Sequence, residues 1–368
     1  MNKNTLEAAP TAGAKELKNQ KRAKAKRIVI GSDVHLRSYQ AARKIDNAAV
    51  GPVVNFRSQE ELLLWVEKQK EQAEEVVVVY ESGPLGYVLY RALRAQGVGC
   101  YVCAPDASQQ KRTRRKNNTI DTRTLTSHLF NYLHGNERAL QLVRVPTEEQ
   151  ERARLQSRQH DQLIAERKRL GAKGNSLLLS LGFGSWKNWW RPKTFSRLSQ
   201  LIPQWVHQLL LTWVDILRNL DQKIRAAKAA LAKGCHGPRP KGAGAVSLVQ
   251  LGAELLDWWR YSSARKIGCA SGMVPSEWST GNRQWQGSIT KVGIPAVRRL
   301  ITEMVWRIIL FQSHYHAVQK WKEVLGGKNR GLKKKAVVAI GRQLVVDLWR
   351  LQTRRATAEQ LGLVMIEG

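Results

Sequence analysis

The sequence predicts an α/β domain, then a long helical segment, then a mostly α-helical C-terminal domain. Three observations support this prediction. Short β-branched runs alternate with helical stretches in the first third of the chain, the apolar period becomes helical after "VRVPTEEQE", and "KGCHGPRPKGAGA" interrupts the helical pattern. A chain of 368 residues with 43% apolar residues is long enough for two domains with buried cores.

The net charge indicates a polyanionic partner. There are 61 Lys and Arg residues against 29 Asp and Glu, giving a formal charge of +32. This excess is far beyond what solubility requires, so nucleic acid is the expected partner. Residues 1–26 are polar and Lys-rich and are predicted to form a flexible basic tail. No run reaches the ~18 apolar residues of a membrane span, and no apolar signal core is present, so we expect a cytoplasmic protein without a membrane partner.

Residues 27–147 have the pattern of an α/β domain. The runs "RIVIGSDVH", "EEVVVVYESG" and "GVGCYVCAP" are predicted strands, and "SQEELLLWVEKQKEQ" and "GYVLYRALRAQG" are predicted helices between them. This alternation favours a largely parallel, buried sheet. The "CYVC" pair, Cys100 and Cys103, lies inside an apolar strand run without a second pair at zinc spacing, so buried strand cysteines are preferred to a metal or redox site.

Acidic residues are scarce, and three of them lie where an α/β sheet binds ligands. Asp33 ends the first predicted strand, Glu81 ends the second, and Asp121 lies at the start of a helix after the basic stretch "KRTRRKNNTID". The carboxyl ends of neighbouring parallel strands meet at one edge of a sheet, so Asp33 and Glu81 are expected to converge. Gathered carboxylates suit Mg²⁺, and Mg²⁺ beside phosphodiesters suits strand cleavage. Singly, each acid is equally compatible with a helix cap or a surface ion pair.

Residues 148–233 are predicted to form two long amphipathic helices that pack on each other or on a second subunit. Between them lies "GFGSWKNWWRPKTFSRLSQLIPQW", in which tryptophans alternate with cations. Two interpretations remain open: Trp189 and Trp190 stack on unpaired bases beside Arg191, or they fill the core of the helix pair. Residues 234–245 are a predicted Gly/Pro linker, 246–352 a helical domain, and 353–368 a tail.

Four stretches resemble, in this order, the DEDD transposases of bacterial insertion sequences, which are the bridge-RNA-guided recombinases of the insertion sequence 110 family. They are "VIGSDVH", "VVVVYESGPLGYVLYRAL", "KNNTIDTRTL" and "SSARKIGCASGMVPSEWSTGNRQWQGSITKVGIPAVRRLI". The resemblance runs from Arg27 to Gln352. It implies a RuvC-like (RNase H-like) domain over 27–147, a coiled-coil segment over 148–233, and a transposase domain with a catalytic serine over 246–352.

The resemblance also implies roles for individual residues. The first, second and last family acids match Asp33, Glu81 and Asp121, and the third matches Asn118, a neutral oxygen donor that holds Mg²⁺ with one charge fewer. In "WSTG", Ser279 or Thr280 occupies the place of the nucleophile. The β-methyl of threonine crowds an attacking oxygen, so we predict that Ser279 attacks the strand to form a phosphoserine link.

Several basic and aromatic residues are expected to contact nucleic acid. They are Arg112, Arg114, Arg115, Lys116, Trp189, Trp190, Arg191, Arg283, Lys291 and Arg298. The resemblance implies donor and target DNA and a non-coding guide (bridge) RNA as partners. It also implies a homodimer or homotetramer, with the working site assembled between subunits, acting at the nucleoid of a bacterial cell.

Two rival functions remain open. In the first, a RuvC-like structure-selective endonuclease hydrolyses branched DNA with the acids and water, and the serine is structural. In the second, Asn118 marks a catalytically decayed site in a protein that only binds nucleic acid. Replacing Ser279 or Asp33 separates these rivals from the recombinase.

Overall fold

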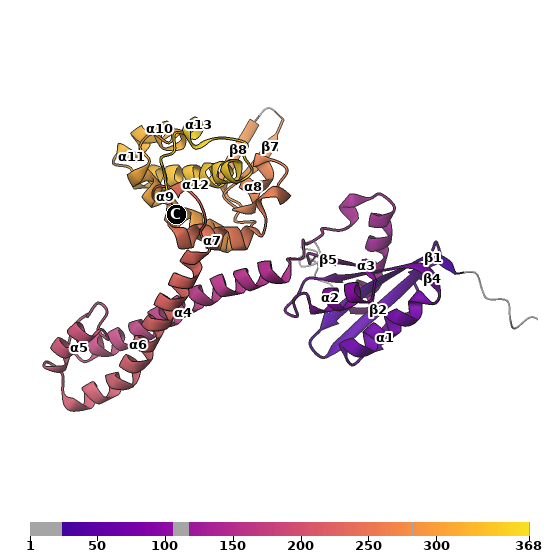
Figure 1. The fold of residues 1–368 in the computed structure, drawn as a ribbon, viewed down its shortest axis with the longest axis horizontal. Helices are drawn as coiled ribbons and strands as arrows, with labels where there is room; N and C mark the ends of the chain where they lie inside the picture. The colour runs from indigo at the N-terminus through magenta and orange to yellow at the C-terminus, as the bar shows by residue number, and fades with distance from the viewer. Residues whose placement is uncertain (1–23, 106–117, 282, 368) are drawn as a thin grey trace, which may run out of the picture. The chain divides into compact units, whose positions relative to one another are not determined.

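The computed structural model describes residues 24–105, 118–281 and 283–367, which form two compact units that divide between Val145 and Pro146 (Figure 1). Arg112, Arg114, Arg115 and Lys116, predicted to contact nucleic acid, lie outside the described residues.

The first unit is built on a five-stranded sheet with the order β3-β2-β1-β4-β5. β1, β4 and β5 run parallel, as predicted, but β2 and β3 add antiparallel beside β1, so the sheet is mixed and not largely parallel. β2 was not predicted because "SYQAARKI" has polar and small residues where β-branched residues usually mark a strand. The strands are β1 (Ala25–His35), β2 (Ser38–Ile45), β3 (Val54–Phe56), β4 (Ala73–Glu81) and β5 (Gly99–Cys103).

Helices cover both faces of this sheet. α1 (Gln59–Lys70) and α2 (Val88–Ala95) pack on one face, and α3 (Asn118–Leu133) packs on the other (Figure 1). Side chains alternate between the two faces along each strand. Val29 and Val77 belong to the core under α3, so the odd-numbered residues of β1 and β4 are those that face α3.

The second unit contains a helical arm and a helical body. In the arm, α4 (Glu148–Ser180) and α6 (Gln204–Lys233) pack on each other, and α5 (Pro192–Ser199) lies in their connection (Figure 1). A capping box of Thr147 and Gln150 begins α4. The body contains seven described helices and one β-hairpin: α7 (Ala245–Leu255), α8 (Ala264–Ala270), β7 (Pro275–Thr280) with β8 (Arg283–Ile289), α9 (Pro295–Phe311), α10 (His316–Lys320), α11 (Lys322–Gly326), α12 (Arg330–Gln352) and α13 (Ala358–Leu361). A short 3-10 turn at Trp258–Arg260 follows α7, and another, at Glu137–Ala139, belongs to the first unit.

The Gly/Pro stretch 234–245 is packed against the body. Its β6 (Arg239–Pro240) pairs with β9 (Met365–Ile366), and Ala243 is buried. The arm is joined to the body by a two-bond ion pair, in which Arg158 Nε and Nη2 lie 2.8 and 3.0 Å from the carboxylate oxygens of Glu254. No described helix is long and apolar enough to span a membrane.

Two tryptophans fill the arm core against glycines of α4. Trp189 is 1% exposed and Trp190 is 7% exposed. A Cβ added at Gly174 would lie 2.0 Å from the ring of Trp189, and one added at Gly171 would lie 2.8 Å from the ring of Trp190. Trp189 Nε1 also donates to the carbonyl oxygen of Gly171, at 2.9 Å. The glycines of "LGAKGN" therefore sit in a helix interior because only hydrogen leaves room for the rings.

The two cysteines of "CYVC" belong to different cores. Cys100 lies with the core under α1 and α2, and Cys103 lies with the core under α3. Burial raises the pKa of both thiols to about 12, and the charge of Glu81 adds to the shift at Cys103. Both are structural cysteines in strand positions, as the sequence predicts.

Replacing Gly174 with Ala tests the arm core. The added methyl group must displace the Trp189 ring, so we expect a loss of about 1–3 kcal/mol in the free energy of unfolding, measured by denaturant titration. Gly326→Ala is the matched control, because no atom lies within 4 Å of a Cβ at that position. Equal stability of the two variants would contradict the packing described.

Alkylation with iodoacetamide at pH 8 tests the cysteine environments. A thiol whose pKa is about 12 stays protonated at pH 8, and the thiolate is the reactive form, so Cys100 and Cys103 are expected to remain unmodified in the folded protein. Cys269 is exposed and should be modified first, as read by peptide mass spectrometry. Rapid modification of either strand cysteine would show that its environment is more open.

Candidate active site

Asp33 and Glu81 are the next residues after the last paired position of β1 and β4, and both belong to the α3 face of the sheet. The parallel register pairs Gly31 with Val79 and Ser32 with Tyr80, which places Asp33 beside Glu81 at the next position. β1 continues to His35, so Asp33 lies inside the strand and not at its end. Its carboxylate is one-fifth exposed and lies 3.1 Å from His35 Nε2.

The first turns of α3 lie unusually close to β1 at Gly31. A Cβ at Gly31 would lie 2.5 Å from the backbone nitrogen of Thr126 and 2.9 Å from the carbonyl oxygen of Thr122. Thr126 Oγ1 accepts the Gly31 N–H at 3.1 Å and is itself within 2.9 Å of the Thr122 carbonyl. This contact holds the N-terminal part of α3, which carries Asp121, over the strand positions that precede Asp33 and Glu81.

Glu81 and Asp121 line one pocket of about 380 Å³. The side chains of His128 and Arg138 and the buried thiol of Cys103 also line it. Two carboxylates with a neighbouring guanidinium make a pocket that can hold a cation and approach a phosphate. Asp33 is not among its lining residues.

Gln40 adds an oxygen donor that sequence reasoning missed. It is the cross-strand partner of Asp33, so its side chain lies on the same face of the sheet. Its Oε1 is buried and has no hydrogen-bond partner among the described residues. A buried amide oxygen without a donor is energetically costly, which makes it a candidate ligand beside Asp33. The signal was absent from the sequence because β2 itself was not recognised.

The structure thus brings together part of the predicted acidic set. Within the described part of the chain, no three His, Cys, Asp or Glu side chains come close enough to share a metal ion. Asn118 begins α3, one helical turn before Asp121, but its side chain lies outside what the structure describes.

Ser279 lies on the exposed hairpin of β7 and β8 (Figure 1). Its Oγ donates to Oε1 of Glu277 at 2.8 Å. The two residues are two apart in a strand, so their side chains project from the same face, whereas Thr280 projects from the other. Glu277 was not predicted as a site residue, although the spacing of two within "SEWST" was a visible signal for it.

The same hairpin exposes two tryptophans on the face opposite Ser279. Trp278 and Trp285 are cross-strand partners and are 65% and 66% exposed. Large aromatic side chains left in water beside cations are suited to stacking on bases. The tryptophans predicted to stack on bases, Trp189 and Trp190, are instead buried in the arm core. The structure thus agrees with the second interpretation of the sequence, in which these two rings fill the core of the helix pair.

The predicted cations of this region have different surroundings. Arg283 is exposed on β8 opposite Thr280, and the side chain of Lys291 is exposed after the hairpin. Arg298 donates from Nη1 to the carbonyl oxygens of Ser271 and Lys291, at 3.3 and 3.2 Å, so it holds the turn that follows the hairpin. Arg191 is exposed at the start of α5.

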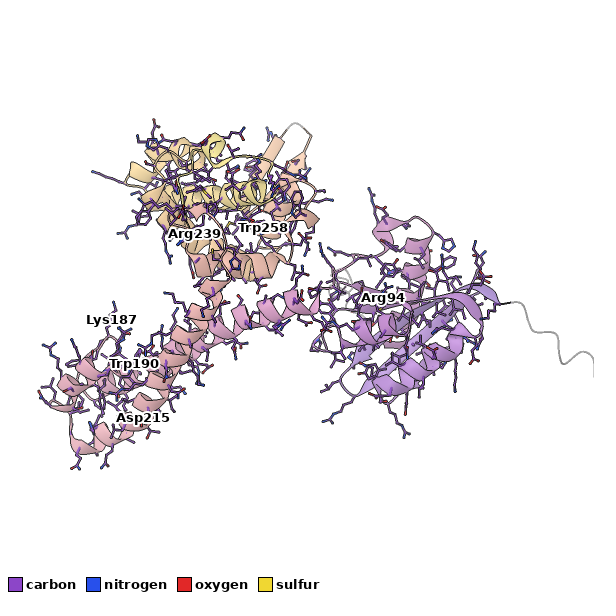
Figure 2. The ribbon with its side chains drawn as sticks, viewed as in Figure 1. Arg94, Lys187, Trp190, Asp215, Arg239 and Trp258 are labelled. Carbon is purple, nitrogen blue, oxygen red and sulfur yellow. The ribbon has the colours of Figure 1, made fainter. Side chains whose placement is uncertain are left out.

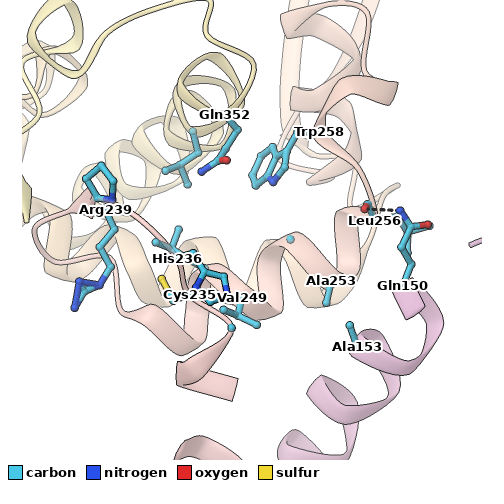
Figure 3. A pocket seen from close by; sticks show the side chains of 15 residues that line it. Gln150, Ala153, Cys235, His236, Arg239, Val249, Ala253, Leu256, Trp258 and Gln352 are labelled. Atoms are coloured by element: carbon cyan, nitrogen blue, oxygen red, sulfur yellow. Dashed lines mark hydrogen bonds between the residues drawn. The ribbon is translucent and has the colours of Figure 1, made fainter. Parts of the chain in front are cut away.

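A second cavity, of about 390 Å³, lies between the start of α4, the segment before α7, and α12. Figure 3 shows Cys235, His236 and Trp258 around it, with Gln150 Nε2 donating to the carbonyl oxygen of Leu256 at 3.1 Å. No described carboxylate lines this cavity, so it lacks the acidic groups that phosphodiester chemistry requires.

The C-terminal body is similar to known transposases. Residues 239–320, which include the β7–β8 hairpin, match the family model Transposase IS116/IS110/IS902. A Sinorhizobium fredii protein named as a candidate transposase, y4rJ, is 29% identical over 304 residues, which are 74% of this chain and 76% of that protein.

Two further relatives are more distant. Another candidate transposase of Sinorhizobium fredii, y4qE, is 28% identical over 236 residues, which cover 63% of this chain and 58% of that protein. The transposase for insertion sequence element IS1328 of Yersinia enterocolitica is 24% identical over 232 residues, which cover 59% of this chain and 67% of that protein. Residues 239–320 are therefore similar to the transposases of the IS116/IS110/IS902 family, and the chain resembles transposases over most of its length.

Proposed function

We propose that the protein is an RNA-guided DNA recombinase of an insertion sequence and that Ser279 is its nucleophile. The observation that carries the proposal is the hydrogen bond from Ser279 Oγ to Glu277 on an exposed hairpin. A hydroxyl that already donates to a carboxylate is oriented for proton transfer, and both groups are accessible to a DNA strand. The hairpin lies inside the segment that matches the transposase family.

In the proposed cleavage step, Ser279 Oγ attacks a phosphorus atom of the DNA backbone. The Oγ–P bond forms, Glu277 takes the hydroxyl proton, and the bond from phosphorus to one deoxyribose oxygen breaks. That oxygen leaves as a hydroxyl group after it gains a proton. Attack by a hydroxyl of another strand on the phosphoserine reverses these changes and joins the new strands, so the step conserves the phosphodiester bond energy.

Lys291 supplies positive charge near the reacting phosphate. Arg283 lies on the hairpin face opposite Ser279, together with Trp278 and Trp285, where it contacts neighbouring phosphates while the two tryptophans supply stacking surfaces for bases. Their exposure on and beside the hairpin supports these roles. Arg298 supports the hairpin indirectly, through the turn it holds.

The acidic edge of the first unit fits Mg²⁺ by the chemistry of its donors. Glu81 and Asp121 share a pocket, Asp33 is level with Glu81, and the buried Gln40 oxygen lacks a partner among the described residues. These residues, together with Asn118, would hold the ion, which would neutralise charge on the phosphate oxygens. Arg138 and His128 line the same pocket and add contacts for the phosphate.

The mixed α/β sheet with α3 on one face supports the RuvC-like assignment of this unit. A non-coding guide RNA that pairs with donor and target DNA is part of the proposal, because the net charge of +32 favours an additional polyanion. A homodimer, or a homotetramer when two DNAs are held together, is likewise proposed.

One alternative rests on the acidic pocket alone. If Glu81 and Asp121 act with water, the protein is a structure-selective endonuclease and Ser279 has no chemical role. The two functions differ in whether a covalent link between protein and DNA forms.

Ser279→Ala is expected to abolish the covalent adduct between the protein, purified with its RNA, and a donor DNA labelled on one strand. Glu277→Gln keeps the hydrogen bond but removes the base, so adduct formation should slow by about 10²-fold or more. Denaturing gel electrophoresis of the labelled DNA measures both effects.

Ser276→Ala is the matched control, because Ser276 belongs to the same strand and its Oγ donates only to the carbonyl oxygen of Ser288, at 2.9 Å. It should leave adduct formation unchanged. Thr280→Ala should also retain the adduct. Cleavage that persists without any adduct in Ser279→Ala would support the endonuclease instead.

A further inference from the structure

The arm carries a pocket rich in arginine that no proposed chemistry uses. It has a volume of about 720 Å³ and lies between α4, the start of α5 and one side of α6. Four arginines and two aspartates line it, with Trp190 as part of its wall; Figure 2 labels Trp190 and Asp215 on this arm. The charged residues are Arg167, Arg191, Arg218, Arg225, Asp215 and Asp221.

The spacing along α6 forms one side of this pocket. Asp215, Arg218, Gln222 and Arg225 follow one another in steps of three and four, so they share a face of the helix. The start of α5 forms another side, where no side chain caps the first turn after Arg191. Pro192, the first residue of α5, has no N–H, so the free donors of this turn are the N–H groups of Lys193 and Thr194, and uncapped N–H groups at a helix start favour an anion.

Two of the arginines are already engaged in building the pocket. Arg167 Nη1 lies 2.8 Å from Asp221 Oδ1, and Trp190 Nε1 donates to Asp221 Oδ2 at 2.8 Å. Burial raises the pKa of Asp221, but the bonds from Trp190 and Arg167 outweigh it, so the pKa is lowered and the carboxylate stays charged. Arg218 Nε donates to the carbonyl oxygen of Trp190 at 3.1 Å.

The other charged groups face the pocket without such engagement. Arg191, Arg225 and Asp215 are exposed, and none of them makes a hydrogen bond or ion pair with another residue that the structure describes. The buried Trp190 keeps the wall rigid, since its ring is fixed against Gly171 and its nitrogen against Asp221. The pocket thus offers two available guanidinium groups and one available carboxylate in a fixed frame.

We propose that this pocket binds the backbone of an RNA segment. Arg191 and Arg225 bind a phosphate, aided by the first turn of α5, and Asp215 accepts a hydrogen bond from a ribose 2′-hydroxyl. A carboxylate in the pocket repels the phosphates of either nucleic acid, but only RNA offers a hydroxyl donor to offset that repulsion. That this RNA is the guide RNA rests on the proposed function, whereas the binding of an RNA backbone by this pocket does not.

The test measures the affinity of the full-length protein for a fluorescent RNA hairpin and a DNA hairpin of matching sequence, across a range of salt concentrations. The double variant Arg191→Gln/Arg225→Gln is expected to bind the RNA hairpin about tenfold more weakly. The slope of log affinity against log salt should fall by about one, the value for the loss of one phosphate contact. Lys173→Gln/Arg197→Gln is the matched control, because it removes two exposed charges of the same arm that do not line the pocket.

Asp215→Ala tests the preference for RNA. It removes both the acceptor and the repulsive charge, so DNA binding should strengthen while the ratio of RNA to DNA affinity falls. Equal losses in the two double variants would overturn the pocket, and an unchanged ratio in Asp215→Ala would overturn the 2′-hydroxyl contact. Thermal unfolding verifies that each variant folds, and the assay contains no strand cleavage, so its outcome is independent of Ser279.

Discussion

The acidic edge of the first unit depends on how closely α3 approaches β1 at Gly31. Any Cβ there would meet the backbone of α3, and the Gly31 N–H instead donates to Thr126 Oγ1. The helix therefore rests directly on the sheet, and its first turns bring Asp121 into the pocket that Glu81 lines. One residue without a side chain thus determines whether carboxylates from a strand and a helix share a site. A similar constraint shapes the arm, where Gly174 leaves room for the buried ring of Trp189.

The proposed nucleophile of the second unit lies on a surface and not in a cleft. Ser279 and Glu277 form a hydrogen-bonded pair because a strand places residues two apart on one face. The strand geometry alone is sufficient to bring the two side chains together. The opposite face carries exposed tryptophans. In the proposed function, this one hairpin presents a hydroxyl, a base and stacking surfaces to a long polyanion. Such an arrangement suits a substrate that is larger than any pocket of the protein.

The sequence was informative where local patterns decide the structure, and less so where distant segments meet. Periodicity predicts the parallel strands and the long helices of the arm, and the structure contains both. In β2 the only β-branched residue is Ile45 at its end, so the strand, and with it the placement of Gln40 beside Asp33, could not be recognised from the sequence. The burial of Trp189 and Trp190 depends on Gly171 and Gly174 of α4, which leave room for the two rings. This tertiary contact could not be predicted from the Trp- and Lys/Arg-rich composition around the tryptophans. Glu277 was within reach of pattern reasoning and was overlooked.

The most direct measurement of the acidic edge is a crystal structure of the full-length protein grown with Mn²⁺, with anomalous scattering recorded at the manganese edge. We expect an anomalous peak between Glu81 and Asp121, with an oxygen of Asp33 or Gln40 turned toward it. The result that would contradict this expectation is an absence of any peak at this edge of the sheet, with Arg138 paired to the carboxylates in place of the ion.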